Sequence, residues 1–198
     1  MNIKKELESL SGKIDRMQFS NVDIQPEKIR AVMINEVVPG DSEQDFYGGG
    51  RTAYLETTIP LFQKAGACAD TINDIIDLGV YITNAVKFPK SEYAISRDQI
   101  ESSLPFLEKE LSLFPDLKVI MLMGDVAKKA FNLISKKTSG KNTIPALSTY
   151  KIRSSEFYYK GIRIMPSYIM TGQNILIEKS KFQMASEDIA NMLDIIRL

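Results

Sequence analysis

The sequence contains no histidine and a single cysteine, Cys68, among its 198 residues. Without histidine, no imidazole is available as a catalytic acid, a catalytic base or a metal ligand. One cysteine cannot form an internal disulfide, an all-cysteine zinc site or a cysteine-held iron–sulfur cluster. We therefore expect a protein without a metal centre of these kinds and without a cofactor.

The sequence also lacks a long apolar segment. The longest stretch without a charged residue covers residues 164–177, is interrupted by Pro166 and Gly172, and is shorter than the ~18 residues that a membrane span needs. Residues 1–17 alternate charged and apolar side chains, unlike the apolar centre of a secretion signal. These features predict a cytoplasmic protein that does not associate with membranes.

Neither sign of charge is in excess, because 25 Lys and Arg balance 25 Asp and Glu. This balance argues against a non-specific polyanion binder but allows local basic patches. The length suits one domain with a sizeable core. No segment is typical of an interdomain linker, so we expect a single domain over residues 1–198, with an amphipathic helix over residues 2–17 packed on it.

Short apolar runs alternate with longer helical patterns. The predicted strands are residues 29–38, 80–86, 117–123 and 161–165, and the predicted helices are residues 52–65, 96–113, 125–136 and 179–197. Ser96 and Gln99 form a capping-box signature, and Asp125 is the expected cap of the third helix. Nearly continuous apolar strands between helices are typical of a covered parallel sheet. The pattern predicts an α/β fold, a three-layer α/β/α sandwich with a central, mainly parallel four-stranded sheet.

Three polar breaks fall at the expected carboxyl ends of strands, where ligands bind in open α/β sheets. The first contains Glu36, the Pro39–Gly40 pair and Asp41, and is followed by three glycines at 48–50. Such glycines let the backbone approach a ligand closely, although they also occur in plain flexible loops. The segment lacks the Lys-Ser/Thr ending of a phosphate-binding loop, which disfavours nucleoside triphosphates.

The second break is Asn84, near the end of an otherwise apolar strand, and the third is the Pro166–Ser167 pair. An unpaired buried amide costs roughly 1 to 3 kcal/mol, so Asn84 must have partners. A carboxamide offers one acceptor beside its donors and matches the N3–H and O4 edge of uracil. A clamp on a neighbouring loop is the alternative for Asn84, and a proline-terminated strand end is the alternative for Pro166 and Ser167.

Taken in order, the motifs of this chain resemble the uracil-DNA glycosylase superfamily, and most closely its thermophile-type, iron–sulfur-bearing branch. The segments that carry the resemblance are residues 36–40, 46–48, 81–87, 105–111, 119–124 and 165–168. The similarity spans roughly residues 29 to 190. It implies the fold of that family and action on a base that is flipped out of DNA.

The resemblance also implies roles for individual residues. Asn84 would pair with uracil, Phe46 would stack on the base, with Tyr47 as its substitute, and Pro39 and Gly40 would shape the floor beside the sugar. Pro166 and Ser167 would hold a phosphate or wedge the duplex. The basic residues near the proposed crevice are the further expected contacts to the nucleic-acid backbone, namely Arg51, Lys87, Lys90 and Lys179. The expected partner is DNA containing uracil or a damaged base, or a free nucleobase or nucleotide.

The chain departs from the family at its catalytic positions. Val37 and Val38 stand where the family keeps its water-positioning residue, and Met165 replaces the family's histidine. Glu36 lies one residue earlier and substitutes only if the strand bulges, because side chains alternate across a sheet. Asp41 is the other candidate for placing water. The cysteines of the family's cluster are missing as well.

Three hypotheses follow. The first is an N-glycosidic hydrolase for uracil or a related base, in which Glu36 or Asp41 positions water. The second is a catalytically degenerate superfamily member that binds a nucleobase, nucleotide or single-stranded nucleic acid. The third is an unrelated α/β protein that binds a metabolite or a protein partner. The surroundings of Asn84 and the position of the two carboxylates distinguish them.

Overall fold

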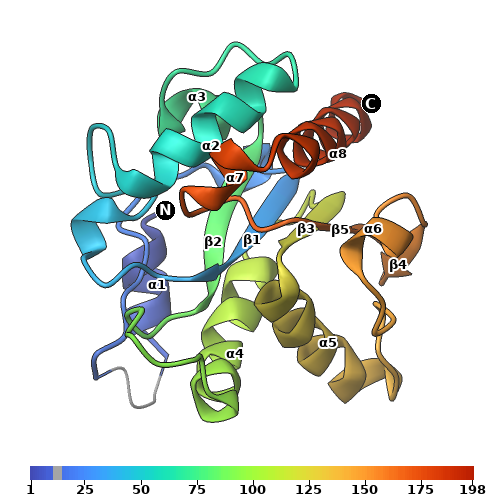
Figure 1. Ribbon diagram of the computed structural model, residues 1–198. Coiled ribbons are helices and arrows are strands. Elements are labelled where there is room, and N and C mark those ends of the chain that lie inside the picture. Colours follow the sequence, from blue (N-terminus) through green and yellow to red (C-terminus); the bar gives the residue numbers. More distant parts are fainter. Residues whose placement is uncertain (11–14) are drawn as a thin grey trace.

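The structure is a computed structural model that describes residues 1–10 and 15–198, and its centre is a five-stranded sheet (Figure 1). The strand order is β2-β1-β3-β5-β4. The strands are β1 (Ala31–Val37), β2 (Val80–Val86), β3 (Val119–Met123), β4 (Phe157–Tyr159) and β5 (Ile162–Ser167). All pairs are parallel except β4 with β5. The predicted α/β class is confirmed, with one strand more than predicted, because the three residues of β4 are too few to show a period.

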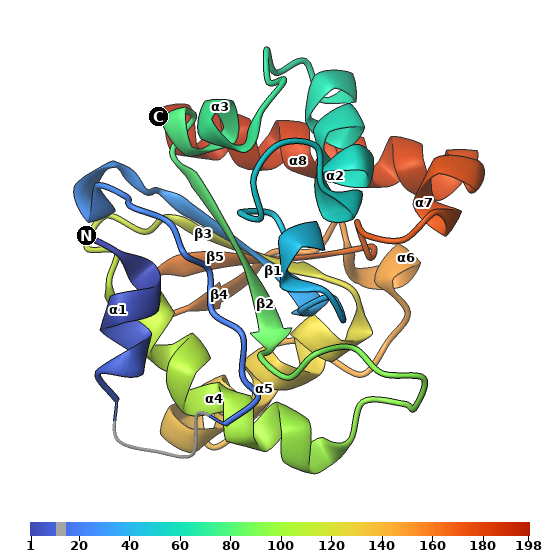
Figure 2. The same ribbon diagram turned by 90° about the vertical axis from the view of Figure 1, so that its left-hand side faces the viewer.

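Helices cover both faces of this sheet and make the expected three layers (Figures 1 and 2). One face carries α4 (Arg97–Ser112) and α5 (Asp125–Ser139), and the other carries α2 (Ala53–Lys64) and α8 (Lys179–Arg197). The shorter elements are α1 (Ile3–Glu8), η1 (Pro26–Lys28), η2 (Ser42–Gln44), α3 (Ile72–Asp77), α6 (Thr149–Ile152) and α7 (Asn174–Ile177). Among the described residues, no helix combines the length and apolar character that crossing a bilayer requires.

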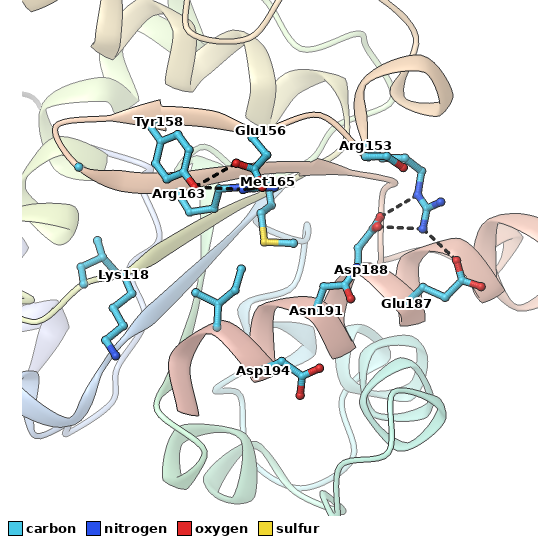
Figure 3. A pocket seen from close by; sticks show the side chains of 14 residues that line it. Lys118, Arg153, Glu156, Tyr158, Arg163, Met165, Glu187, Asp188, Asn191 and Asp194 are labelled. Carbon is cyan, nitrogen blue, oxygen red and sulfur yellow. Dashed lines mark hydrogen bonds and ion pairs between the residues drawn. The ribbon is translucent and has the colours of Figure 1, made fainter. Parts of the chain in front are cut away.

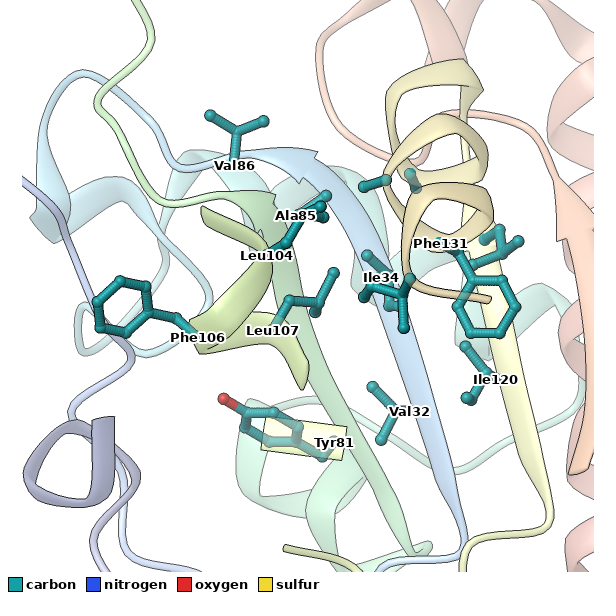
Figure 4. Close-up of a cluster of buried hydrophobic side chains, with 14 of the residues drawn as sticks. Val32, Ile34, Tyr81, Ala85, Val86, Leu104, Phe106, Leu107, Ile120 and Phe131 are labelled. Atoms are coloured by element: carbon teal, nitrogen blue, oxygen red, sulfur yellow. The ribbon is translucent and has the colours of Figure 1, made fainter. Parts of the chain in front are cut away.

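Side chains of the strands alternate between two apolar clusters. In β1, Val32 and Ile34 pack toward α4 and α5, in the cluster shown in Figure 4. Ala31 and Met33 pack on the opposite face, toward α2 and α8. Full burial of a side chain such as Val32, Ile34 or Met33 stabilises the fold by roughly 1.5–3 kcal/mol. The same alternation determines which face each polar residue at the end of β1 can reach.

The amino-terminal helix is shorter than predicted. Helix α1 ends at Glu8 instead of residue 17, and residues 11–14 of the predicted helix lie outside the described residues. Ile3 and Leu7 are fully buried on the α4 side of the sheet. Met17 packs against the same cluster although it lies beyond the helix. The apolar pattern therefore identified the buried side chains, but it did not require a helix along the whole segment.

The start of α5 also differs from the prediction. Gly124, with φ +108°, is the N-cap, and Asp125 is the first helical residue, so Asp125 does not cap the helix. A Cβ at position 124 would lie 2.5 Å from Glu36 Oε1. The close approach and the positive φ both require glycine here. The carboxylate at the end of β1 is consequently packed against the start of α5.

Candidate functional site

Two asparagines meet at the carboxyl ends of β1 and β2. Asn35 and Asn84 are register partners in these parallel strands, and both side chains are buried. Asn35 Nδ2 donates a hydrogen bond of 2.8 Å to Asn84 Oδ1. The acceptor of the Asn84 amide is therefore engaged by a neighbouring side chain.

The donor of the same amide is engaged by Asp45, from the segment between η2 and α2. Asn84 Nδ2 lies 3.1 Å from Asp45 Oδ1 and 3.0 Å from Oδ2. The backbone N–H of Phe46 also donates to Oδ1, at 2.9 Å. Burial raises the pKa of Asp45, and the hydrogen bonds from Asn84 and Phe46 oppose that increase.

Thr171, from the segment after β5, completes the group. Its Oγ1 donates to Asn35 Oδ1 at 3.1 Å. Thr171, Asn35, Asn84 and Asp45, here called the polar quartet, connect the ends of β1 and β2 with the segments that follow β1 and β5. The carboxyl edge of the sheet therefore brings separate parts of the chain together, as predicted for an open α/β sheet. Helices α6 and α7 lie at the same edge (Figure 2).

Both aromatic residues proposed for base stacking are engaged in the fold. Phe46 is fully buried, in the cluster under α2, with its ring centroid 5.2 Å from that of Tyr54. Tyr47 stacks on Tyr81, and its hydroxyl both donates to the carbonyl and accepts from the N–H of Ile82, at 3.0 Å each. Burial raises the pKa of Tyr47 well above its usual range. Tyr47 thus pairs the free backbone groups of β2, which is an edge strand.

Pro39 and Gly40 lie where the segments after β1 and β2 touch. Pro39 is buried and Gly40 is exposed. The N–H of Lys90 donates to the carbonyl of Val38 at 3.0 Å, and a Cβ at Gly40 would lie 3.2 Å from the carbonyl oxygen of Lys90. The pair therefore lets two loops approach each other. A contact to a sugar stays a prediction.

Neither carboxylate predicted to position water lies with Asn84. Between Asn35 and Val37 the register of β1 with β2 advances without a bulge, so Glu36 faces α5 and Asn35 faces α2. Glu36 Oε1 accepts from the N–H of Val126 at 3.1 Å. Burial raises the pKa of Glu36, and this hydrogen bond opposes the increase. Asp41 is exposed and caps η2 through the N–H of Glu43.

Three of the residues predicted to contact a nucleic-acid backbone are buried in the structure. Lys87 is buried, and its Nζ lies 2.5 Å from Glu110 Oε2. Pro166 is buried inside β5, and Ser167 is buried and donates to Asp188 at 2.6 Å. These polar groups satisfy one another within the core. Of the predicted set, Arg51, Lys90 and Lys179 are exposed.

A large hollow lies apart from the polar quartet. It is a cleft of about 860 Å³ between α8 and the β4–β5 pair (Figure 3). On one side Arg153 binds Glu187 and Asp188, and on the other Arg163 binds Glu156 and Tyr158. Most of its charged groups are therefore already paired.

Three residues of the polar quartet, Asn35, Asp45 and Thr171, were not among the residues predicted from the sequence. A signal existed for Asn35, because it is a second carboxamide near the end of a second predicted strand, but its pairing with Asn84 needs the strand register. Asp45 directly precedes the proposed stacking residue and gave no other signal. Thr171 lies 136 residues from its partner Asn35.

Comparison with known proteins identifies the family. The family described as "Uracil DNA glycosylase superfamily" matches residues 40–187 of this chain. The match starts at Gly40 and so leaves out Glu36 and the valines of the first motif. No curated protein matches the chain. The order of the motifs, the three-layer fold and this match lead to one conclusion: the chain belongs to the uracil DNA glycosylase superfamily.

Proposed function

We propose that this chain binds nucleic acid at the carboxyl edge of its sheet and leaves the bond between base and sugar intact. The observation that carries the proposal is the state of the Asn84 amide. Its NH2 group donates to Asp45 and its oxygen accepts from Asn35, so protein side chains already bind both polar ends of the amide that would read the edge of uracil.

The positions around Asn84 support binding more than hydrolysis. A general base must come within hydrogen-bond reach of the water that it activates, directly or through one more water. Glu36 binds the start of α5 on the other face of the sheet, and Asp41 caps an exposed turn. Met165 is buried in the cluster under α8. Each of these side chains is therefore held by contacts within the protein.

The exposed residues of this edge suit a nucleic-acid strand. Ile169 and Ile177 follow β5 and are 40% and 74% exposed. Large apolar side chains at this exposure can insert between bases, and cations such as Lys90 and Lys179 can neutralise phosphates. In this proposal Ile169 and Ile177 take the wedge role expected of the Pro166–Ser167 pair, which is buried.

Direct binding measurements test the proposal. We expect single-stranded oligonucleotides to raise the fluorescence anisotropy signal, with affinity decreasing as salt increases. Replacing Ile169 and Ile177 together by alanine should weaken binding at least fivefold, whereas Leu198→Ala, at another exposed apolar residue, should not change it. Equal affinities for wild type and both variants, or no binding by wild type, would refute the proposal.

A second candidate is base hydrolysis with Asp45 in place of Glu36. It is favoured by one observation, a buried carboxylate of raised pKa that contacts Asn84. Asp45 would have to turn away from the amide when a base enters. Uracil release by the wild type that is lost in Asp45→Asn and retained in Glu36→Gln would support this candidate and overturn the first. No release by the wild type at saturating protein supports the first.

A further inference from the structure

Two hollows follow helix α5 away from the carboxyl edge. The first, about 450 Å³, lies between α5, the start of α4 and the segment 142–147. The second, about 520 Å³, lies between the end of α5, residues 141–143 and the segment 156–160. They share Asn142. We call this pair of hollows the α5 track; α5 and the segment after it lie at the lower right of Figure 1.

Positive charge is concentrated along the α5 track, although the chain as a whole is neutral. Its basic residues are Arg97, Lys128, Lys129, Lys136, Lys141 and Lys160, and its acidic residues are Asp125 and Glu156. Arg97 pairs with Glu101, and Lys128 pairs with Asp125. Within residues 1–10 and 15–198, the other four lysines form no ion pair. These four charges are available to a ligand.

The segment that walls the α5 track is held in place by side chains of α5. Asn132 Nδ2 donates to the carbonyl of Ile144 at 2.8 Å, and the N–H of Ile144 donates back to Asn132 Oδ1 at 2.9 Å. Ser139 Oγ donates to the carbonyl of Lys141 at 2.9 Å. A wall fixed in this way is ordered before a ligand arrives, which lowers the entropy cost of binding.

Aromatic side chains stand at the far end of the α5 track. Tyr158 is 58% exposed, and Lys160 lies 5.3 Å from the ring centroid of Tyr159. Lys129 and Lys136 are seven residues apart, so they share one side of α5 at about 10 Å along its axis. A basic groove that ends on aromatic rings is the arrangement that single-stranded nucleic acids favour, because phosphates contact the cations and bases stack on the rings.

We infer that the α5 track binds the sugar–phosphate backbone of a single nucleic-acid strand that continues from the carboxyl edge of the sheet. The inference rests on the proposed function, because the edge must bind the same strand. Continuity supports it: Gly124, at the carboxyl end of β3, begins α5, and its N–H binds the carbonyl of Ser167 at the end of β5. The track thus begins at the carboxyl edge of the sheet, where Asp125, the first residue of α5, lines its first hollow.

The test compares two triple variants with the same change in charge. Lys129, Lys136 and Lys141 are replaced by alanine in one, and the exposed lysines Lys5, Lys28 and Lys64, away from the track, in the other. Affinity for 8-mer and 20-mer oligothymidylate is measured against salt. We expect wild type to bind the 20-mer more tightly. The track variant should lose at least tenfold in affinity for the 20-mer. The slope of the logarithm of its affinity against the logarithm of salt concentration should fall by about 2 in magnitude, because each of the three lost phosphate contacts contributes ~0.7.

Each outcome decides a different point. Retained binding of the 20-mer by the control variant, with the loss in the track variant, supports the inference. Equal loss in both variants, or no loss in either, overturns the α5 track while the proposed function stands. No binding of either oligonucleotide by wild type refutes the proposed function and the inference with it. If polyglutamate competes as well as oligothymidylate does, the occupant is an acidic protein segment, and the inference is wrong.

Discussion

A buried residue that carries a charge shows most clearly how the fold determines the role of a side chain. The sequence predicts a phosphate contact for Lys87, because it follows Asn84 closely at the end of a strand. In the structure its ammonium binds Glu110 and the hydroxyl of Thr83, and it is 2% exposed. Glu110 in turn accepts from Tyr81 and Thr83. The sequence contains no local sign of this pair, since its members are 23 residues apart.

We predict that Lys87→Met lowers the free energy of unfolding by about 3–5 kcal/mol, because it leaves the Glu110 carboxylate buried without its cation. Lys90→Met, at an exposed position, should change it by less than about 0.5 kcal/mol. Urea unfolding measures both. If Lys87→Met does not fold, adding Glu110→Gln should restore folding, since the amide needs no counterion. Similar small effects of the two single variants would contradict the buried ion pair.

The raised pKa of Asp45 predicts how the stability of the fold depends on pH. Its pKa is raised by burial above the ordinary 3.8, so the folded state binds more protons than the unfolded state between these two values. The contribution of Asp45 to stability must therefore decrease as pH rises above 3.8 and level off above the raised pKa. Asp45→Asn removes this dependence. The free energy of unfolding of wild type minus that of Asp45→Asn should fall with pH in denaturation series, and a difference that rises would show a lowered pKa instead.

At the scale of elements, the end of β1 and the start of α5 form one unit. The alternation of side chains along β1 was known from the sequence, and it correctly indicated that Glu36 needs a bulge to join Asn84. The register has no bulge, so the carboxylate binds the N–H of Val126 in the first turn of α5. A carboxylate near a helix amino terminus is stabilised by the unpaired N–H groups and the helix dipole.

Two glycine substitutions separate packing from backbone strain. Gly140→Ala, at φ +73° with nothing within 4 Å of the new Cβ, should cost about 1–2 kcal/mol. Gly124→Ala, at φ +108° with its Cβ 2.5 Å from Glu36 Oε1, should lower the free energy of unfolding by about 1–3 kcal/mol more, because the Glu36 side chain must shift. Adding Glu36→Ala should recover part of that excess. Thermal or urea unfolding that gives equal losses for the two glycine variants would show that Glu36 does not pack against Gly124.

For the whole molecule, the sequence predicts the layers better than the site. Long apolar strands and amphipathic helices follow from local periodicity, and all eight predicted elements of the sheet and its covering helices are present. Strand β4 and helices α3, α6 and α7 were missed because elements of three to six residues contain too few residues to show a period. The polar quartet depends on contacts between residues 39 to 136 positions apart, which only the folded chain determines.

The central claim is that Asn84 is held by its own protein, and the side-chain NH2 signal of Asn84 in ¹⁵N–¹H correlation spectra tests it most directly. The signal is assigned by its loss in Asn84→Asp and followed while a uracil-containing single strand is added to saturation, with a thymine strand of the same length as control. We predict that the signal has the same position with either strand, because the amide stays hydrogen-bonded to Asp45 and Asn35. A shift that saturates with the uracil strand and is absent with the thymine strand would contradict this account.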